Sequence, residues 1–253
     1  MQVEGPKLTG LLFSGGIVST AHQPVDVNAI IQASGQQRLR GETVERLMIQ
    51  APKARFDVGI ALRVLDECLR DPAGVLNLTA IGRRLSLDPR TVDQYLDLLQ
   101  RRHMLHFVPN LESNANSNIR SRAKVYPVGV GQSVESLRRA DPQLLAQPDV
   151  ANRLLESWVV DQIVPRLEEG VRPYYWRTPK GDKQVDVVLA GQGGKVVGLQ
   201  VRSREQVVPQ DAPGLRALTA AHDLAAGYVI YLGARIVRLN NRCWALPAAA
   251  LAG

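Results

Sequence analysis

The apolar positions in the first half of the chain recur three or four residues apart, which is the spacing of one face of a helix. This spacing holds over residues 56–69 and 89–101, and over a shorter stretch at residues 80–85. Residues 86–88 (Ser-Leu-Asp) predict a tight turn between the second and the third of these helices. A helix, a short helix, a sharp turn and a longer helix together predict a helix-turn-helix.

The residues that flank these helices add caps and a wing. Thr79 is suited to cap the short helix, and Asp88 before a proline is a typical start of the longer one. Two strands, at residues 104–108 and 120–128, then enclose a loop that is rich in Asn and Ser. We therefore predict a winged helix over residues 56–140.

The pattern changes in the second half of the chain to short runs of β-branched residues. Residues 184–189 and 195–202 are two such runs joined by a Gly-rich turn, which predicts a β-hairpin. Residues 227–232 are apolar throughout, which favours a central strand. The other expected elements are a helix at 150–167, a strand at 174–177, a helix at 213–224 and a last hairpin at 236–245. Their order predicts a mixed α/β domain with a central mixed sheet over residues 141–253.

Composition narrows the classes of protein that fit this pattern. The chain has 253 residues, 45% of them hydrophobic, and a mean hydropathy of −0.10, which is typical of a soluble protein. The sequence shows neither a signal peptide nor a membrane span, so we expect a cytoplasmic protein without a membrane partner. Cys68 and Cys243 lie far apart without metal-ligand spacing, which predicts buried, reduced thiols. The usual phosphate loop is absent, so ATP hydrolysis by this chain is not expected.

The charge balance points to a polyanionic partner. The net charge is +7, and residues 70–130 hold nine Lys or Arg against five Asp or Glu, a net of +4. We expect phosphate contacts from the basic residues and base contacts from the start of the third helix. The candidate contacts to double-stranded DNA are Arg83, Arg84, Arg90, Thr91, Gln94, Arg101, Arg120, Arg122 and Lys124. The alternative is a winged helix that contacts only protein, because Asp93 and Asp97 share the exposed face and repel phosphate.

Three polar residues interrupt the predicted hairpin at 184–202. Asp186 lies in its first strand, and Gln200 and Arg202 share one face of its second strand. A carboxylate, a second oxygen ligand and a cation on one edge form the layout of a metal-dependent nuclease, in which Asp186 would be the Mg²⁺ ligand. Here Gln-x-Arg stands where such a site has Glu-x-Lys. Gln200 lacks the negative charge that a glutamate would supply, and Arg202 cannot act as a base. The pattern therefore predicts a degenerate nuclease site.

Several runs of the sequence resemble one known family. LTAIGRRLSLDPRTVDQYLDLLQRRHMLHFVPN, LLESWVVDQI, YYWRTPKGDKQVDVVL and GLQVRS resemble the C-terminal part of prokaryotic AAA-type ATPases that end in a domain of unknown function. The resemblance implies a winged helix followed by a domain that resembles the PD-(D/E)xK nuclease fold. It places Glu156 at the helix-borne acid, Asp186 at the metal-binding aspartate, and Gln200 and Arg202 at the Glu and Lys of the third motif. It also implies that residues 1–55 are a helical or linker segment left from an ATPase module, since the ATPase core is missing.

These observations leave three hypotheses about function. The first is a nucleic-acid-binding or scaffold protein whose nuclease-like domain is catalytically degenerate, in which Asp186 and Arg202 form an ion pair. The second is a metal-dependent DNA nuclease with an altered Asp…Gln-x-Arg motif, and only this hypothesis requires Mg²⁺. The third is a protein-interaction module that contacts a separate ATPase or another copy of itself. The first hypothesis implies no cofactor.

Overall fold

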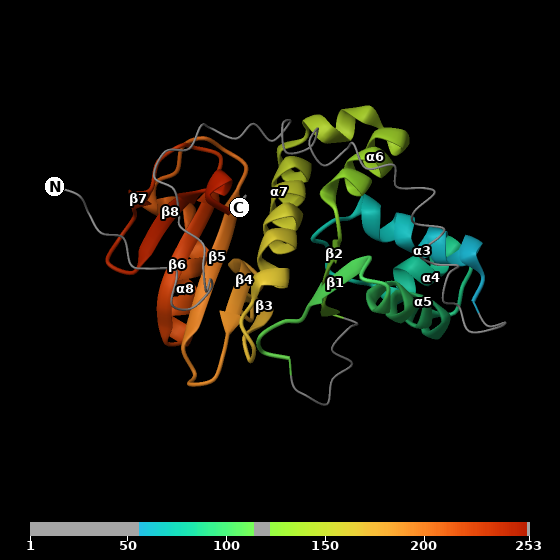
Figure 1. Cartoon of the computed structure of the whole chain (residues 1–253), viewed down its shortest axis with the longest axis horizontal. Coiled ribbons are helices and arrows are strands. Elements are labelled where there is room, and N and C mark those ends of the chain that lie inside the picture. The colour runs from blue at the N-terminus through green and yellow to red at the C-terminus, as the bar shows by residue number, and fades with distance from the viewer. Residues whose placement is uncertain (1–55, 114–121, 252–253) are drawn as a thin grey trace. The chain divides into compact units, whose positions relative to one another are not determined.

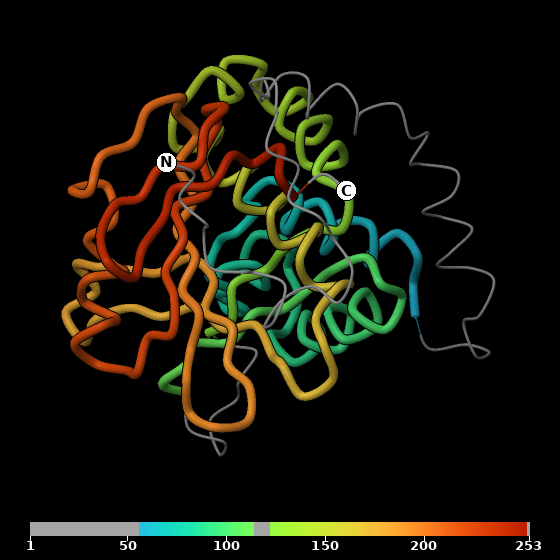
Figure 2. Tube along the Cα trace, turned by 60° about the vertical axis from the view of Figure 1, so that its left-hand side comes forward, coloured from blue at the N-terminus to red at the C-terminus, as the bar shows by residue number. Residues whose placement is uncertain are grey.

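The computed structural model describes residues 56–113 and 122–251, and it confirms the predicted mixed α/β class. The described chain divides into two compact units, one ending at Trp158 and the other beginning at Val159. The predicted segment at residues 1–55 lies outside the described residues, and the predicted boundary after residue 140 stays a prediction. Figure 2 follows the trace from the blue and green helices of the first unit, through the yellow helix α7 (Pro148–Ile163), to the orange and red strands of the second.

The first unit has the element order of a winged helix (Figure 1). Its helices are α3 (Val58–Arg70), α4 (Leu78–Leu85) and α5 (Pro89–Arg101), followed by the antiparallel strands β1 (Leu105–Val108) and β2 (Lys124–Pro127). Val75, between α3 and α4, forms a bridge with Lys124, so a third short extended segment joins the wing. The unit continues with α6 (Val130–Ala140), a 3-10 turn (Pro142–Ala146) and the start of α7 (Pro148–Ile163).

The apolar stripes of α3, α4 and α5 form the core of the first unit. Val64, Leu96 and Leu99 are fully buried in it, as the helical spacing of the sequence predicts. Tyr95 closes the open end of this core: its hydroxyl accepts a hydrogen bond from the Asp57 backbone N–H at 3.0 Å, just before α3 begins. The apolar spacing therefore accounts for the packing of all three helices.

The start of α4 differs from the prediction by two residues. The helix begins at Leu78, and the Asn77 side chain caps it by accepting a hydrogen bond from the Ala80 backbone N–H at 2.9 Å. The prediction of Thr79 as the cap was therefore wrong. Asn and Thr are both good caps, and Asn77 is the residue with the extended backbone that a cap requires. The predicted cap of α5 is confirmed, because Asp88 accepts a hydrogen bond from the Arg90 backbone N–H at 2.8 Å.

The turn between α4 and α5 is tight because Gly82 has no side chain. The Leu87 backbone N–H donates to the Gly82 carbonyl at 2.8 Å, and a Cβ at Gly82 would lie 2.6 Å from the Leu87 carbonyl oxygen. Ser86 turns the chain here with a left-handed backbone, at φ 57°. The helix-turn-helix angle therefore depends on one glycine inside a helix.

We predict that Gly82→Ala lowers the free energy of unfolding by about 1–3 kcal/mol, because the new methyl group collides with backbone. The matched control is Gly59→Ala in α3, where a Cβ would meet only a side-chain oxygen of Asp57 at 3.0 Å. The control is expected to be neutral or slightly stabilising, since alanine favours helix over glycine. Urea unfolding followed by circular dichroism measures both variants. Equal stability of the two variants would contradict this explanation of the turn.

The second unit is built on a mixed sheet. Within the described residues six strands form it, in the order β3-β4-β5-β6-β8-β7, and the β5-β6 and β6-β8 pairs are parallel (Figure 1). The strands are β3 (Arg172–Arg177), β4 (Gln184–Ala190), β5 (Val196–Arg202), β6 (Leu224–Tyr231), β7 (Val237–Arg238) and β8 (Cys243–Pro247). The predicted β4–β5 hairpin, the central position of β6 and the last hairpin are all confirmed.

Helix α8 (Pro213–Ala221) links β5 to β6 and packs on the sheet. Gly198 in β5 makes room for this helix, because a Cβ there would lie 2.7 Å from the Leu215 side chain. The 3-10 turns of this unit are Val164–Arg166, Pro209–Asp211 and Ala248–Leu251. The helix predicted to reach residue 167 ends instead at Ile163, because Pro165 has no backbone N–H to continue it.

Both cysteines are buried and free, as predicted. Burial raises the pKa of the Cys68 thiol and also that of Cys243, which disfavours the reactive thiolate. Among the helices of residues 56–113 and 122–251, none has both the length and the apolar character needed to cross a membrane.

Candidate functional site

The predicted site lies where strands β4 and β5 separate. Their paired register runs from Ala190 opposite Val196 to Val187 opposite Leu199. Beyond that point in the described sheet, β4 continues on β3 and β5 continues on β6. Residues 184–186 of β4 and 200–202 of β5 therefore form a fork. Along the fork, the backbone groups that each strand turns toward the other make no strand-to-strand hydrogen bonds. Buried backbone groups of this kind need other hydrogen-bond partners.

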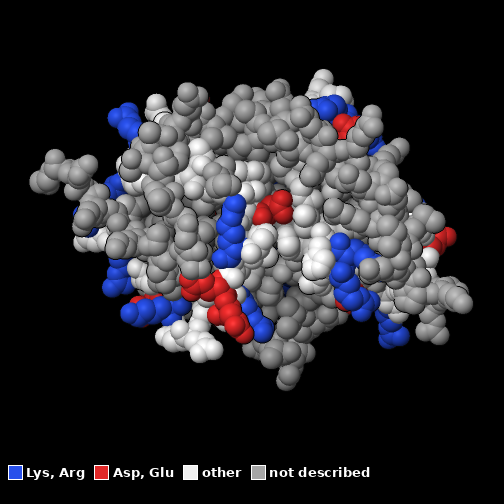
Figure 3. Space-filling model, in the orientation of Figure 1, with Lys and Arg blue, Asp and Glu red and all other residues white. Residues whose placement is uncertain are grey.

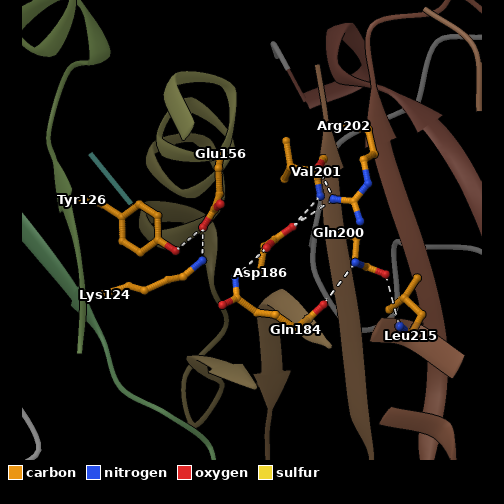
Figure 4. A network of polar contacts seen from close by, with 9 residues as sticks. All are labelled: Lys124, Tyr126, Glu156, Gln184, Asp186, Gln200, Val201, Arg202 and Leu215. Carbon is orange, nitrogen blue, oxygen red and sulfur yellow. Dashed lines mark hydrogen bonds and ion pairs between the residues drawn. The ribbon is translucent and has the colours of Figure 1, made fainter. Parts of the chain in front are cut away.

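Asp186 and Gln200 supply these partners across the fork (Figure 4). The Asp186 Oδ2 atom accepts a hydrogen bond from the Val201 backbone N–H at 2.9 Å, and the Gln200 Nε2 atom donates to the Gln184 carbonyl at 3.1 Å. The two side chains thus replace the missing ladder bonds between the strands. Asp186 is 6% exposed and Gln200 is 2% exposed. This role explains why polar residues stand inside two strongly apolar strands.

The Asp186 carboxylate is engaged at both oxygens. Its Oδ1 atom accepts from the Gln184 Nε2 atom at 3.0 Å, and the Arg202 guanidinium lies 3.8 Å from Oδ2. The same guanidinium also donates to the Val201 carbonyl at 2.7 Å. The predicted ion pair between Asp186 and Arg202 is present, and a metal ion at Asp186 would compete with three donors.

Gln200 also fixes the start of helix α8. Its Oε1 atom accepts a hydrogen bond from the Leu215 backbone N–H at 3.2 Å, a group in the first turn that has no partner inside the helix. An amide donates and accepts at once, which a glutamate carboxylate cannot do. The helix approaches so closely that a Cβ on Gly214 would lie 1.9 Å from the Gln184 carbonyl oxygen. Glutamine at this position is therefore specified by the fold of the fork.

Two residues of the fork were not identified from the sequence. Gln184 lies two positions before Asp186, so strand alternation places both side chains on one face, and this signal could have found it. Gly214 follows a proline at a helix start, and its contact with β4 has no local sequence signal. Within the described residues, no group of three or more His, Cys, Asp or Glu side chains is placed to hold a metal ion.

Glu156, the predicted helix-borne acid, belongs to the first unit. Its Oε1 atom accepts hydrogen bonds from the Lys124 Nζ atom and the Tyr126 hydroxyl, each at 2.6 Å (Figure 4). Glu156 and Lys124 are each 3% exposed, so this is a buried ion pair between α7 and the wing strand β2. The prediction that Lys124 contacts DNA is corrected, because a buried ammonium group in an ion pair cannot reach a phosphate.

The other candidate DNA contacts differ in exposure and in whether a carboxylate neutralises them. Arg84 bonds to Glu67 at 2.6 Å, and Arg101 pairs with Asp97 one turn away. Arg83 and Arg90 are exposed, and within the described residues neither has a carboxylate partner. Gln94 and Arg122 are also exposed and Thr91 is half-buried, whereas Arg120 lies outside the described residues. Figure 3 shows Lys and Arg side chains on the surface of both units.

Comparison with protein families accounts for most of the chain in two parts. Residues 151–251 match a domain of unknown function (DUF4143), which is found in AAA-ATPase-associated proteins. Residues 44–141 match a second domain of unknown function (DUF8612). No match was found among curated proteins or among solved structures. The two matched regions thus lie side by side in the sequence, and neither family has an assigned activity.

Proposed function

We propose that this chain binds double-stranded DNA through its winged helix and that its nuclease-like domain is a non-catalytic scaffold. The observation that carries the proposal is which arginines around the helix-turn-helix have a carboxylate partner. Arg83 and Arg90 are exposed without a carboxylate partner in the described residues, while the neighbouring Arg84 and Arg101 are paired. Uncompensated positive charge on α4 and α5 is what a phosphate backbone would neutralise.

The position of these residues gives each a separate role. Arg83 lies in the last turn of α4, where a guanidinium suits a phosphate contact. Arg90 and Gln94 lie one turn apart at the start of α5, the end of a recognition helix that reads base edges. An arginine pairs well with guanine and a glutamine with adenine in the major groove. Arg90 and Gln94 are therefore the residues that would give the binding its sequence preference.

The non-catalytic part of the proposal rests on the fork. Asp186 accepts hydrogen bonds at both carboxylate oxygens, and the Gln200 amide joins β4 to α8. A hydrolytic metal site needs carboxylate oxygens that are free to bind the ion and its water. These contacts favour a structural role for the fork over cleavage of DNA.

We predict that Arg83→Ala/Arg90→Ala weakens binding to a duplex of about 30 base pairs by about tenfold and lowers the salt slope by about 1, because Arg83 is the phosphate contact of the two. The matched control is Arg70→Ala/Arg139→Ala, which removes the same charge from exposed arginines that pair with Asp66 and Glu135. Fluorescence anisotropy over a salt series measures both double variants. The control should stay within about twofold of the wild type. An equal loss in both variants would mean that binding depends only on net charge, which contradicts the proposed surface.

A second candidate function is contact with a separate ATPase. It is supported by the match of residues 151–251 to a domain found in AAA-ATPase-associated proteins. Co-expression with a phosphate-loop ATPase from the neighbouring reading frame, followed by size-exclusion chromatography, tests it. A stable complex without detectable DNA binding would favour this function over the first one.

A further inference from the structure

Strand β7 is the outermost strand of the second unit and pairs with β8 in the described sheet. The Leu239 backbone N–H donates to the Cys243 carbonyl at 2.9 Å, so Leu239 faces β8. Successive residues of an antiparallel strand direct their backbone N–H and C=O groups alternately toward and away from the neighbouring strand. The backbone groups of Ile236 and Arg238 therefore point away from β8. Among the described strands none pairs with this outer side of β7, so the edge can serve as a template for another strand.

The same edge carries exposed apolar side chains. Ile236 is 46% exposed and Val237 is 39% exposed, and they are adjacent. Both are β-branched residues, which pack best against the side chains of a neighbouring strand. Adjacent residues point to opposite faces of a strand, so one added strand would cover part of each.

The segment of the chain that contains β7 is positively charged. Arg235, Arg238 and Arg242 are exposed, and residues 224–251 contain neither Asp nor Glu. In the described residues two of these guanidinium groups bond to neutral oxygens: Arg238 to the Asn240 carbonyl and the Asn241 side chain, and Arg242 to the Leu224 carbonyl. A second copy of this chain would bring like charges together across the edge, which is unfavourable. A strand that carries carboxylates would be attracted.

We propose that β7 is a docking edge for an extended segment of a partner protein in which β-branched residues are flanked by Asp or Glu. The segment adds to the sheet through the outward backbone groups of Ile236 and Arg238. Its apolar side chains cover Ile236 and Val237, and its carboxylates meet the arginines. The edge is held in shape beforehand, since the Tyr231 hydroxyl donates to the Arg235 carbonyl and fixes the start of β7. The proposal is independent of DNA binding by the winged helix.

The test is selection of random peptides of about 10 residues, displayed on phage, against the full chain. Enriched peptides are then made synthetically and their affinity is measured by fluorescence anisotropy. We expect acidic, β-branched sequences that bind at least tenfold more weakly to Ile236→Ser/Val237→Ser and to Arg235→Glu/Arg238→Glu. The matched control is Val208→Ser, which changes a side chain that is 52% exposed outside β7. Amide chemical shifts should change along residues 235–247.

Three results would overturn the proposal. The first is the absence of any selected peptide that loses affinity in the β7 variants. The second is a set of selected peptides without acidic residues. The third is a weakened affinity of Arg235→Glu/Arg238→Glu for duplex DNA without an effect on peptides, which would make the edge a nucleic-acid surface. Circular dichroism of each variant confirms that the fold is retained, since all five substituted positions are exposed.

Discussion

Glu156→Ala is expected to lower the free energy of unfolding by about 3–5 kcal/mol, because it leaves the Lys124 ammonium group buried without its carboxylate. The Nζ atom of Lys124 lies 2.6 Å from the Glu156 Oε1 atom, and both side chains are at most 5% exposed. Water cannot replace the lost partner at such a site without opening the contact between α7 and β2. Urea unfolding at neutral pH, followed by circular dichroism, measures the loss.

The double variant Lys124→Met/Glu156→Leu is the control for this prediction. Replacing a buried ion pair by apolar residues of similar volume is often neutral or stabilising, so the double variant should recover part of the loss, although the Tyr126 hydroxyl still lacks its acceptor. Tyr126→Phe removes one hydrogen bond to the carboxylate and should cost about 1.5–3 kcal/mol. A single Glu156→Ala variant that unfolds within about 1 kcal/mol of the wild type would contradict the buried pair.

Gln200→Glu is expected to destabilise the second unit by about 3 kcal/mol or more at neutral pH, because a carboxylate would face the Gln184 carbonyl instead of donating to it. The protonated form of the new carboxyl can donate, so the loss should shrink as the pH falls toward about 5. Urea unfolding of variant and wild type at both pH values measures this difference. The substitution introduces the glutamate that a nuclease site has at this position. Its effect on stability therefore shows whether the fork needs an amide there.

The matched control for Gln200→Glu is Gln192→Glu in the exposed turn between β4 and β5. The same chemical change there should stay within about 0.5 kcal/mol of the wild type at either pH. A Gln200→Glu variant as stable as this control would show that the amide bridge to α8 contributes nothing. The role assigned to the fork would then be wrong.

The elements that depend on local patterns were predictable from the sequence. Apolar spacing gave α3 and α5, Asp88 marked the start of α5, and the Gly-rich turn marked the β4–β5 hairpin. Pairing of the two strands of the hairpin also brought Asp186 and Arg202 together as expected. These features are set by residues close in sequence or by the register of one hairpin.

The features that failed or were missed depend on distant parts of the chain. Lys124 looked like a surface residue of a basic strand, and its partner Glu156 lies 32 residues later. Gln200 looked like a lost ligand, whereas its amide is needed by the Gln184 carbonyl and by α8, which begins 13 residues after it. A polar residue in a strand has the same sequence pattern whether it binds a ligand or closes a fork. Only tertiary contacts separate the two roles.

The most direct test of binding without cleavage is one gel of supercoiled plasmid incubated with the wild-type chain at low salt, with and without Mg²⁺ or Mn²⁺. We expect retarded plasmid that returns to its supercoiled position when the salt is raised, because binding rests on phosphate contacts. Nicked or linear plasmid that appears only with the metal ion, and is lost in Asp186→Ala, would contradict the account. An unretarded plasmid at low salt would contradict it equally.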